Sequence, residues 1–161
     1  MARNECKITI KAGFGHAHRS VAFLQYPVPY VDVEGAFDSL DKASERFHLK
    51  SFDMWMDDHH RPKRYHGWNK SEHKGEYSDC FVFKNVGECE RLYGFLCHPK
   101  APEDPNYEMC VLVLYAQKKK WNTDTAELDR VEKMRKDTHV QAALQDPDLF
   151  KEGEGEHTWN T

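Results

Sequence analysis

Three runs of alternating residues decide the fold: YSDCFVF (77–83), ERLYGFLC (90–97) and MCVLVLY (109–115). Two regular sets of side chains interleave in each run, and this period of two is typical of β-strands. In the third run the alternation places Tyr115 on the same face as Met109. The turn residues Asn85-Val86-Gly87-Glu88 join the first two runs, and a loop with three prolines precedes the third. Short connections between neighbouring strands predict an antiparallel meander.

The flanking segments predict one more strand and several helices. Residues 6–12 alternate as a half-buried strand, and residues 21–24 form an apolar run that fits either a strand or a helix. Apolar residues at helical spacing between 33 and 57 predict two helices or one kinked helix, with a phase slip near His48-Leu49. A capping pattern at 123–127 begins a helix that is expected to run to about Leu144. The segment 61–75 is expected to be a loop.

These elements predict a small α+β fold. We expect an antiparallel sheet, made of the three-strand meander plus the N-terminal strand, with helices on one face. Along the chain we expect an N-terminal strand and irregular extension at 1–32, the α+β domain at 33–145, and an acidic tail at 146–161.

Composition excludes several classes of protein. The 161 residues are 39% hydrophobic and 31% charged, and no run approaches the 18 apolar residues that a membrane-spanning helix needs. The N-terminus has no apolar run of the kind that a secretion signal contains. Five cysteines, with no CxxC pair, favour reduced thiols. We therefore expect a cytoplasmic protein without membrane contact.

Charge and motif spacing indicate which ligands the protein can bind. The net charge is −4, yet residues 61–75 carry five basic side chains and one acidic one, so a local patch can meet phosphate. The ten histidines complete no metal-binding motif, and surface positions are the preferred interpretation; His59, His60 and His66 are the best of the metal alternatives. The turn at 13–19 lacks the complete glycine pattern of a nucleotide-binding loop. We expect neither a metal nor a cofactor.

The segment 90–131 carries a resemblance to a known family. Its parts are ERLYGFL (90–96), VLVLYAQKKK (111–120) and the capped helix AELDRV (126–131). This pattern resembles the RelE/HigB-like toxin superfamily, including its phage-derived HigB-type members. Those proteins place an arginine in the strand after the first hairpin turn, end the next strand in a lysine pair, and follow it with a helix. The helix around 37–43 and the basic loop before Tyr77 extend the resemblance to about 33–145.

The resemblance implies a RelE-like fold and, in active members, ribosome-dependent mRNA cleavage. There the ribose 2′-hydroxyl attacks the adjacent phosphate, and the enzyme neutralises the developing charge and manages protons. Arg91 then matches the strand arginine, and Lys118 and Lys119 match the lysine pair; these three are the expected catalytic residues. The expected RNA-binding residues are Arg61, Lys63, Arg64, Tyr93, Lys120 and Trp121. The implied partners are an antitoxin protein and the ribosome with its mRNA.

Two other interpretations stay open. A non-catalytic binding or adaptor protein on the same scaffold would contact a basic partner through acidic surfaces, and a ParE-type relative would share the fold without nuclease chemistry. Arg91 alone fits equally well as a cross-strand partner of a carboxylate, and residues 118–120 fit a solvated strand end. Clustering of Arg91 with the lysine pair and the 61–64 loop on one concave face would favour RNA cleavage. Dispersal of those charges, or their neutralisation by Glu90, Glu103 and Asp104, would favour a binding role.

Overall fold

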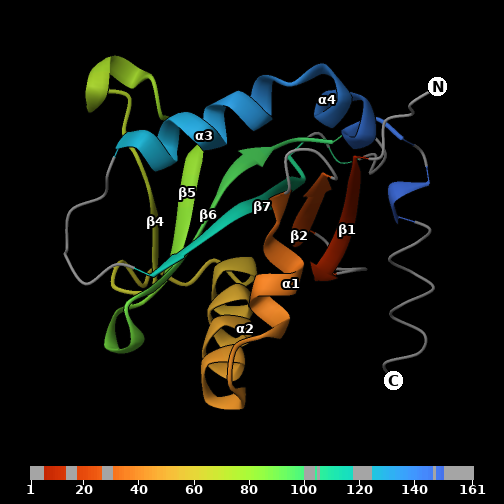
Figure 1. Cartoon of the computed structure of the whole chain (residues 1–161). Coiled ribbons are helices and arrows are strands. Elements are labelled where there is room, and N and C mark those ends of the chain that lie inside the picture. Colours follow the sequence, from red (N-terminus) through yellow and green to blue (C-terminus); the bar gives the residue numbers. More distant parts are fainter. Residues whose placement is uncertain are drawn as a thin grey trace.

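The chain forms one mixed β-sheet with helices on both faces (Figure 1). The computed structural model describes residues 6–13, 18–26, 31–99, 104, 106–117, 125–146 and 148–150. Its strands are β1 (Lys7–Ala12), β2 (Arg19–Tyr26), β3 (Val31–Asp32), β4 (Tyr65–Gly67), β5 (Cys80–Asn85), β6 (Glu90–Cys97) and β7 (Glu108–Gln117). Its α-helices are α1 (Val33–Asp38), α2 (Lys42–Met56), α3 (Thr125–Lys136) and α4 (Thr138–Leu144), and short 3₁₀ turns lie at His73–Gly75 and Val86–Glu88.

The sheet is larger than the sequence predicted, and it is not purely antiparallel. The strand order is β1-β2-β7-β6-β5-β4, and β3 pairs with β2 beside this path. The meander β5-β6-β7 is present as expected, but β2 runs parallel to β7, with Arg19 opposite Glu108 and Phe23 opposite Leu112. The prediction of a small antiparallel sheet is therefore wrong. The apolar run at 21–24 is part of β2, and the expected loop at 61–75 contains the edge strand β4.

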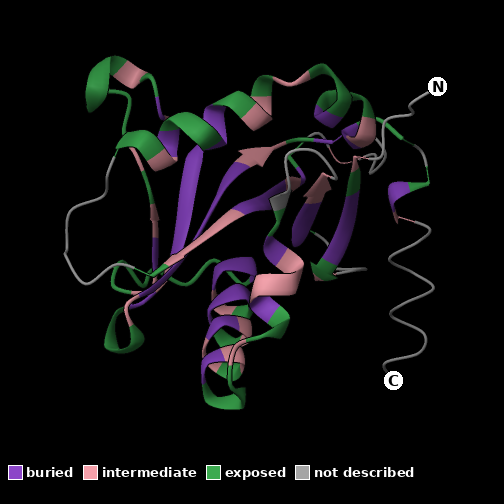
Figure 2. Ribbon diagram, viewed as in Figure 1, coloured by how far each residue is buried: buried purple, intermediate pink, exposed green. Residues whose placement is uncertain are grey.

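The prediction that helices cover only one face is also wrong. Helices α1 and α2 pack on one face of the sheet, over a cluster that includes Phe23, Phe83 and Leu112. Helices α3 and α4 pack on the other face, over a cluster that includes Val82 and Phe95. Both sets of alternating side chains are apolar, so each face needs its own cover. Figure 2 shows buried residues along the strands and on the inner sides of the helices.

The predicted strand faces are wrong at two places. Tyr77 precedes β5 and packs on the α3 side rather than with Phe81, and a β-bulge changes the faces at the end of β7. The alternation is confirmed through most of the meander, because Phe81 and Leu92 face α2 while Val82 and Tyr93 face α3. The β6–β7 register then shifts between Tyr93 and Gly94. Beyond this bulge Tyr115 packs with the α2-side cluster rather than with Met109. An extra residue in one strand reverses the side of every residue that follows it.

Aspartate caps set the helix boundaries at places that periodicity alone did not reveal. The carboxylate of Asp41 accepts from the amide of Ser44 at 2.8 Å and begins α2, so the break between α1 and α2 lies at residues 39–41 rather than near His48. Asp137 accepts from the amides of His139 and Val140 and begins α4. The expected helix to Leu144 is therefore two helices.

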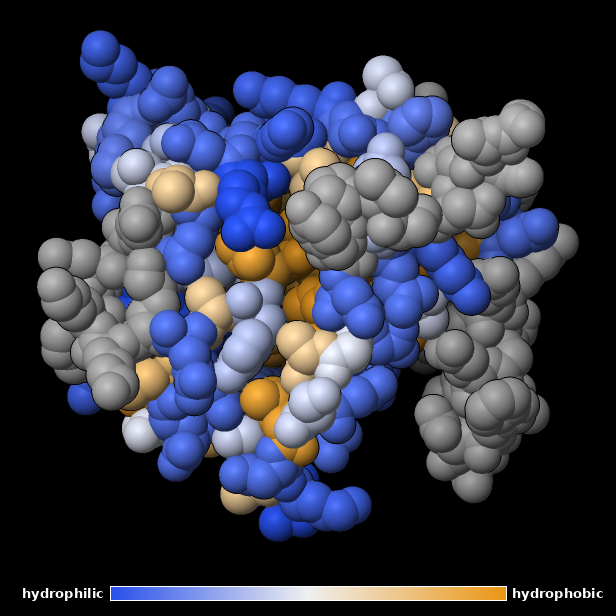
Figure 3. All heavy atoms as spheres, in the orientation of Figure 1, coloured by the Kyte–Doolittle hydropathy of each residue, from blue (hydrophilic) through white to orange (hydrophobic). Residues whose placement is uncertain are grey.

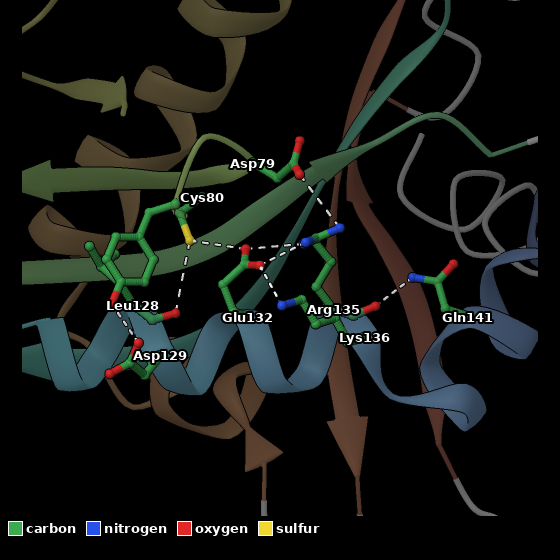
Figure 4. Close-up of polar contacts among 9 residues, drawn as sticks. Asp79, Cys80, Leu128, Asp129, Glu132, Arg135, Lys136 and Gln141 are labelled. Carbon is green, nitrogen blue, oxygen red and sulfur yellow. Dashed lines mark hydrogen bonds and ion pairs between the residues drawn. The ribbon is translucent and has the colours of Figure 1, made fainter. Parts of the chain in front are cut away.

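A polar network fixes α3 to the start of β5, at Asp79 and Cys80 (Figure 4). The buried carboxylate of Glu132 accepts from Arg135 at 2.7 Å and from the Cys80 thiol at 3.5 Å. Arg135 also reaches Asp79 at 3.5 Å, and the Tyr77 hydroxyl donates to Asp129 at 2.5 Å. These contacts hold α3 over the Cys80 end of the strands.

Candidate functional site

Two cations stand directly opposite each other on the α3-side face of the sheet. The β5–β6 register pairs Lys84 with Arg91, and both share the strand phase of residues that contact α3, Val82 on β5 and Tyr93 on β6. Like charges at opposed positions on neighbouring strands destabilise a sheet. The pair is therefore a candidate site for an anionic ligand.

Burial makes this arrangement more costly. Arg91 is only 8% exposed, and its guanidinium donates to the Tyr93 hydroxyl at 3.3 Å. Lys84 is half-buried and makes no ion pair within the described residues. Burial, and then the charge of Arg91, lower the pKa of Lys84. Both effects oppose a positive charge at this place, and a bound anion would relieve both.

His66 and Trp68 extend the cluster on the edge strand β4. The register sets His66 opposite Val82, one diagonal step from Lys84. The His66 ring lies 4.9 Å from the Trp68 ring, centroid to centroid, and its Nδ1 lies 3.0 Å from the Gly67 carbonyl oxygen. Burial lowers the pKa of His66; the Gly67 hydrogen bond and the charge of Glu72 oppose this, while Lys84 and Arg91 reinforce it. The charges of Lys84 and Arg91 thus act on His66 from β5, the neighbour of β4, and from β6, the next strand in the sheet.

The basic loop before β4 does not supply all its cations to this cluster. Arg64 turns toward α2: its guanidinium lies 3.9 Å from the Phe47 ring centroid and donates to Ser51 Oγ at 2.8 Å and to the Phe47 carbonyl at 3.0 Å. Arg61 is exposed and donates to the carbonyl of His60, and Lys63 is exposed. Arg64 thus stands on the opposite face of the sheet from Arg91.

The remaining predicted residues are Lys118, Lys119, Lys120 and Trp121, and they lie outside the described residues. The last described residues of β7 stand next to the pair of cations. Ala116 is opposite Arg91, and Gln117 is opposite Glu90.

Glu90 does not neutralise its neighbour Arg91, because its side chain enters the α2-side layer. There its Oε1 lies 3.0 Å from His48 Nε2 and accepts from Asn85 Nδ2 at 3.3 Å. His48 is fully buried, and its Nδ1 has no hydrogen-bond partner among the described residues. Burial lowers the pKa of His48, against the hydrogen bond and charge of Glu90. This dyad ties α2 to the hairpin that carries Lys84 and Arg91.

Sequence reasoning missed Lys84 as a site residue and listed His66 only as a metal alternative. The signal for Lys84 was present: it shares the alternation of Cys80 and Val82, and a turn separates it from Arg91. His66 carried no such signal, because β4 has only three residues and its partner strand cannot be read from the sequence.

The surface around these layers is mostly polar. Figure 3 shows hydrophilic side chains over most of one face of the molecule, with apolar side chains emerging in its middle, between α3 and α2. No helix in the described segments is both long and apolar enough to cross a bilayer. Within the same segments, no three His, Cys, Asp or Glu side chains come together as a metal site.

Comparison of the chain with protein-family models, with curated proteins and with solved structures finds no match.

Proposed function

We propose that the protein is a RelE/HigB-like toxin that cleaves mRNA on the ribosome, acts in the cytoplasm and is neutralised by an antitoxin protein. The observation that carries this proposal is the opposed pair of the half-buried Lys84 and the buried Arg91, with His66 and Tyr93 beside it. A cross-strand pair of like charges costs stability, and an RNA phosphate is a ligand that would offset this cost.

The residue types suit phosphoryl transfer to a neighbouring hydroxyl. The ribose 2′-oxygen bonds to phosphorus, the bond from phosphorus to the 5′-oxygen breaks, and the products are a 2′,3′-cyclic phosphate and a 5′-hydroxyl. Negative charge grows on the phosphate oxygens in the transition state. Arg91 can grip two of these oxygens and Lys84 can act as a point charge beside them.

Two further features support the proposal. After β2, the helices α1 and α2, the basic segment, the strands β5 to β7 and the helix α3 follow in the order that the resemblance implies. Trp68 is half-buried beside His66, and an indole at that place offers a stacking surface for a base.

The test is cleavage of a reporter mRNA and growth arrest on induced expression in bacteria. We expect wild type to arrest growth and cut the message, and Arg91→Ala and Lys84→Ala each to lower the cleavage rate of purified protein on programmed ribosomes about a hundredfold. Lys50→Ala, an exposed lysine on α2, is the matched control and should leave cleavage unchanged. A folded wild type that neither arrests growth nor cuts the message would overturn the proposal.

A further inference from the structure

We propose that His66 is the general base of this site and takes the proton from the attacking 2′-hydroxyl through its Nε2. This inference rests on the proposed function, and it assigns a proton acceptor that neither Arg91 nor Lys84 provides. Both of those side chains are donors, and among the described residues of the cluster His66 is the side chain suited to accept a proton near neutral pH.

The hydrogen bond to Gly67 sets the tautomer of His66. A backbone carbonyl only accepts, so the contact of 3.0 Å between Nδ1 and the Gly67 oxygen requires the proton of the neutral ring to be on Nδ1. The lone pair is then on Nε2. Within the described residues Nε2 has no hydrogen-bond partner, which leaves it available to a substrate hydroxyl.

The strand pairing places this base beside the cations that would hold the phosphate. Lys84 is its diagonal neighbour on β5, and Arg91 stands opposite Lys84 on β6. A 2′-hydroxyl is separated from its own 3′-phosphate by two carbon atoms. A base must therefore act close to the phosphate-binding groups. Lys84 is a diagonal neighbour of His66, about 7–8 Å away, and Arg91 is two strands away, about 10 Å, so a phosphate bound between the ends of these long side chains lies within reach of His66.

The charges around His66 favour the neutral ring before reaction. Burial lowers its pKa, and the positive charges of Lys84 and Arg91 act in the same direction; the Gly67 carbonyl and the Glu72 carboxylate oppose them. When Nε2 takes the proton, the phosphate gains negative charge, which stabilises the new imidazolium. The same proton can pass to the departing 5′-oxygen, so the step balances without another reactant.

The test compares the pH dependence of cleavage by wild type, His66→Gln and His66→Ala on programmed ribosomes. For wild type, the cleavage rate should rise with pH to a plateau, with a midpoint below about 6.5, the ordinary pKa of histidine. The kcat of His66→Gln should be lower by about a hundredfold or more, and its rate should no longer rise with pH in the acidic range, the acid limb of the profile. Its affinity for a message with a 2′-deoxy nucleotide at the cleavage position should stay unchanged. Added imidazole should restore part of the activity of His66→Ala. His60→Gln, an exposed histidine, is the control.

Each outcome has a distinct meaning. If wild type cleaves and His66→Gln keeps both its rate and its acid limb, the role of His66 is overturned while the proposed function stands. Weak binding of the 2′-deoxy message with unchanged kcat and pH profile would make His66 a binding residue and also overturn the proposal. If folded wild type does not cleave RNA, both proposals fall.

Discussion

At the scale of single residues, Glu90 and Arg91 show that neighbouring residues of one strand enter opposite layers of the protein. The side chain of Glu90 bonds to His48 in the α2-side layer, while Arg91 points to the α3 side and bonds to Tyr93. The alternation in the sequence predicted that Arg91 and Tyr93 share a face, and this is confirmed. Lys84 could be placed opposite Arg91 from the alternation and the short turn between them, whereas the position of His66 depends on a register that no local pattern encodes.

Gly94 gives a residue-scale prediction because the backbone of β7 approaches it closely at the bulge. A Cβ atom built at Gly94 would lie 2.2 Å from the Val111 carbonyl oxygen. We expect Gly94→Ala to lower the free energy of unfolding by about 2–3 kcal/mol, because backbone must move to relieve the overlap. Urea denaturation monitored by tryptophan fluorescence measures this.

Gly87 is the matched control for that substitution. A Cβ at Gly87 would meet only Asn85 Oδ1, at 3.8 Å, which is ordinary contact. Gly87→Ala should change stability by less than about 0.5 kcal/mol. Equal effects of the two substitutions would contradict the close approach at the bulge.

At the scale of elements, local chemistry predicted the strands of the meander better than the helices. The strands are confirmed because period-two alternation persists on both sides of the 85–88 turn. The helix boundaries differ from the prediction because Asp41 caps α2 before the slip expected near His48, and Asp137 supplies a cap inside what was predicted as one helix. The strand β4 was missed because three residues are too few to show a period.

The attachment of α3 gives an element-scale prediction. Glu132 is 7% exposed and accepts two hydrogen bonds from Arg135, at 3.0 and 2.7 Å. We expect Glu132→Gln to lower the free energy of unfolding by about 1–3 kcal/mol, because a neutral amide oxygen replaces the carboxylate that accepts from Arg135 and from the Cys80 thiol. Lys133→Gln, an exposed position on the same helix, should have little effect in the same urea titration. Similar losses in both variants would show that Glu132 does not anchor the helix.

At the scale of the whole molecule, the sequence did not foretell the mixed sheet. The pairing of β2 with β7 joins residues about ninety positions apart. Its parallel direction depends on the path of the helices and strands that lie between them in the chain. The apolar character of both strand faces was visible in the sequence, and it is the feature that indicates helices on both sides.

The buried His48 gives a prediction about global stability and pH. Because burial lowers its pKa in the folded protein, the unfolded chain binds the proton more readily. The stability from the neutral His48 is therefore complete above the ordinary histidine pKa of about 6.5 and is lost as pH falls below it. We expect the free energy of unfolding to decrease between pH 7.5 and 5.5, by at most about 1.4 kcal/mol per pH unit from this residue.

Urea titrations across that range test this expectation. His48→Gln keeps an amide donor for Glu90 but cannot titrate, so its stability should vary less with pH than that of wild type. His60→Gln, at an exposed site, should follow the wild-type slope. An unchanged slope in His48→Gln would assign the pH dependence to other groups, His66 included.

The parallel pairing of β2 with β7 also has a consequence for how the protein is made. As the chain leaves a translating ribosome, β1 and β2 emerge long before β7, and residues 19–23 of β2 lack their parallel partner until residues 108–112 follow. Folding of the full sheet is therefore a late event in synthesis, and it closes a loop of some ninety residues in one step. During that interval both faces of β2 expose apolar side chains, Phe23 on one face and Leu24 on the other, and a chaperone can recognise such a surface.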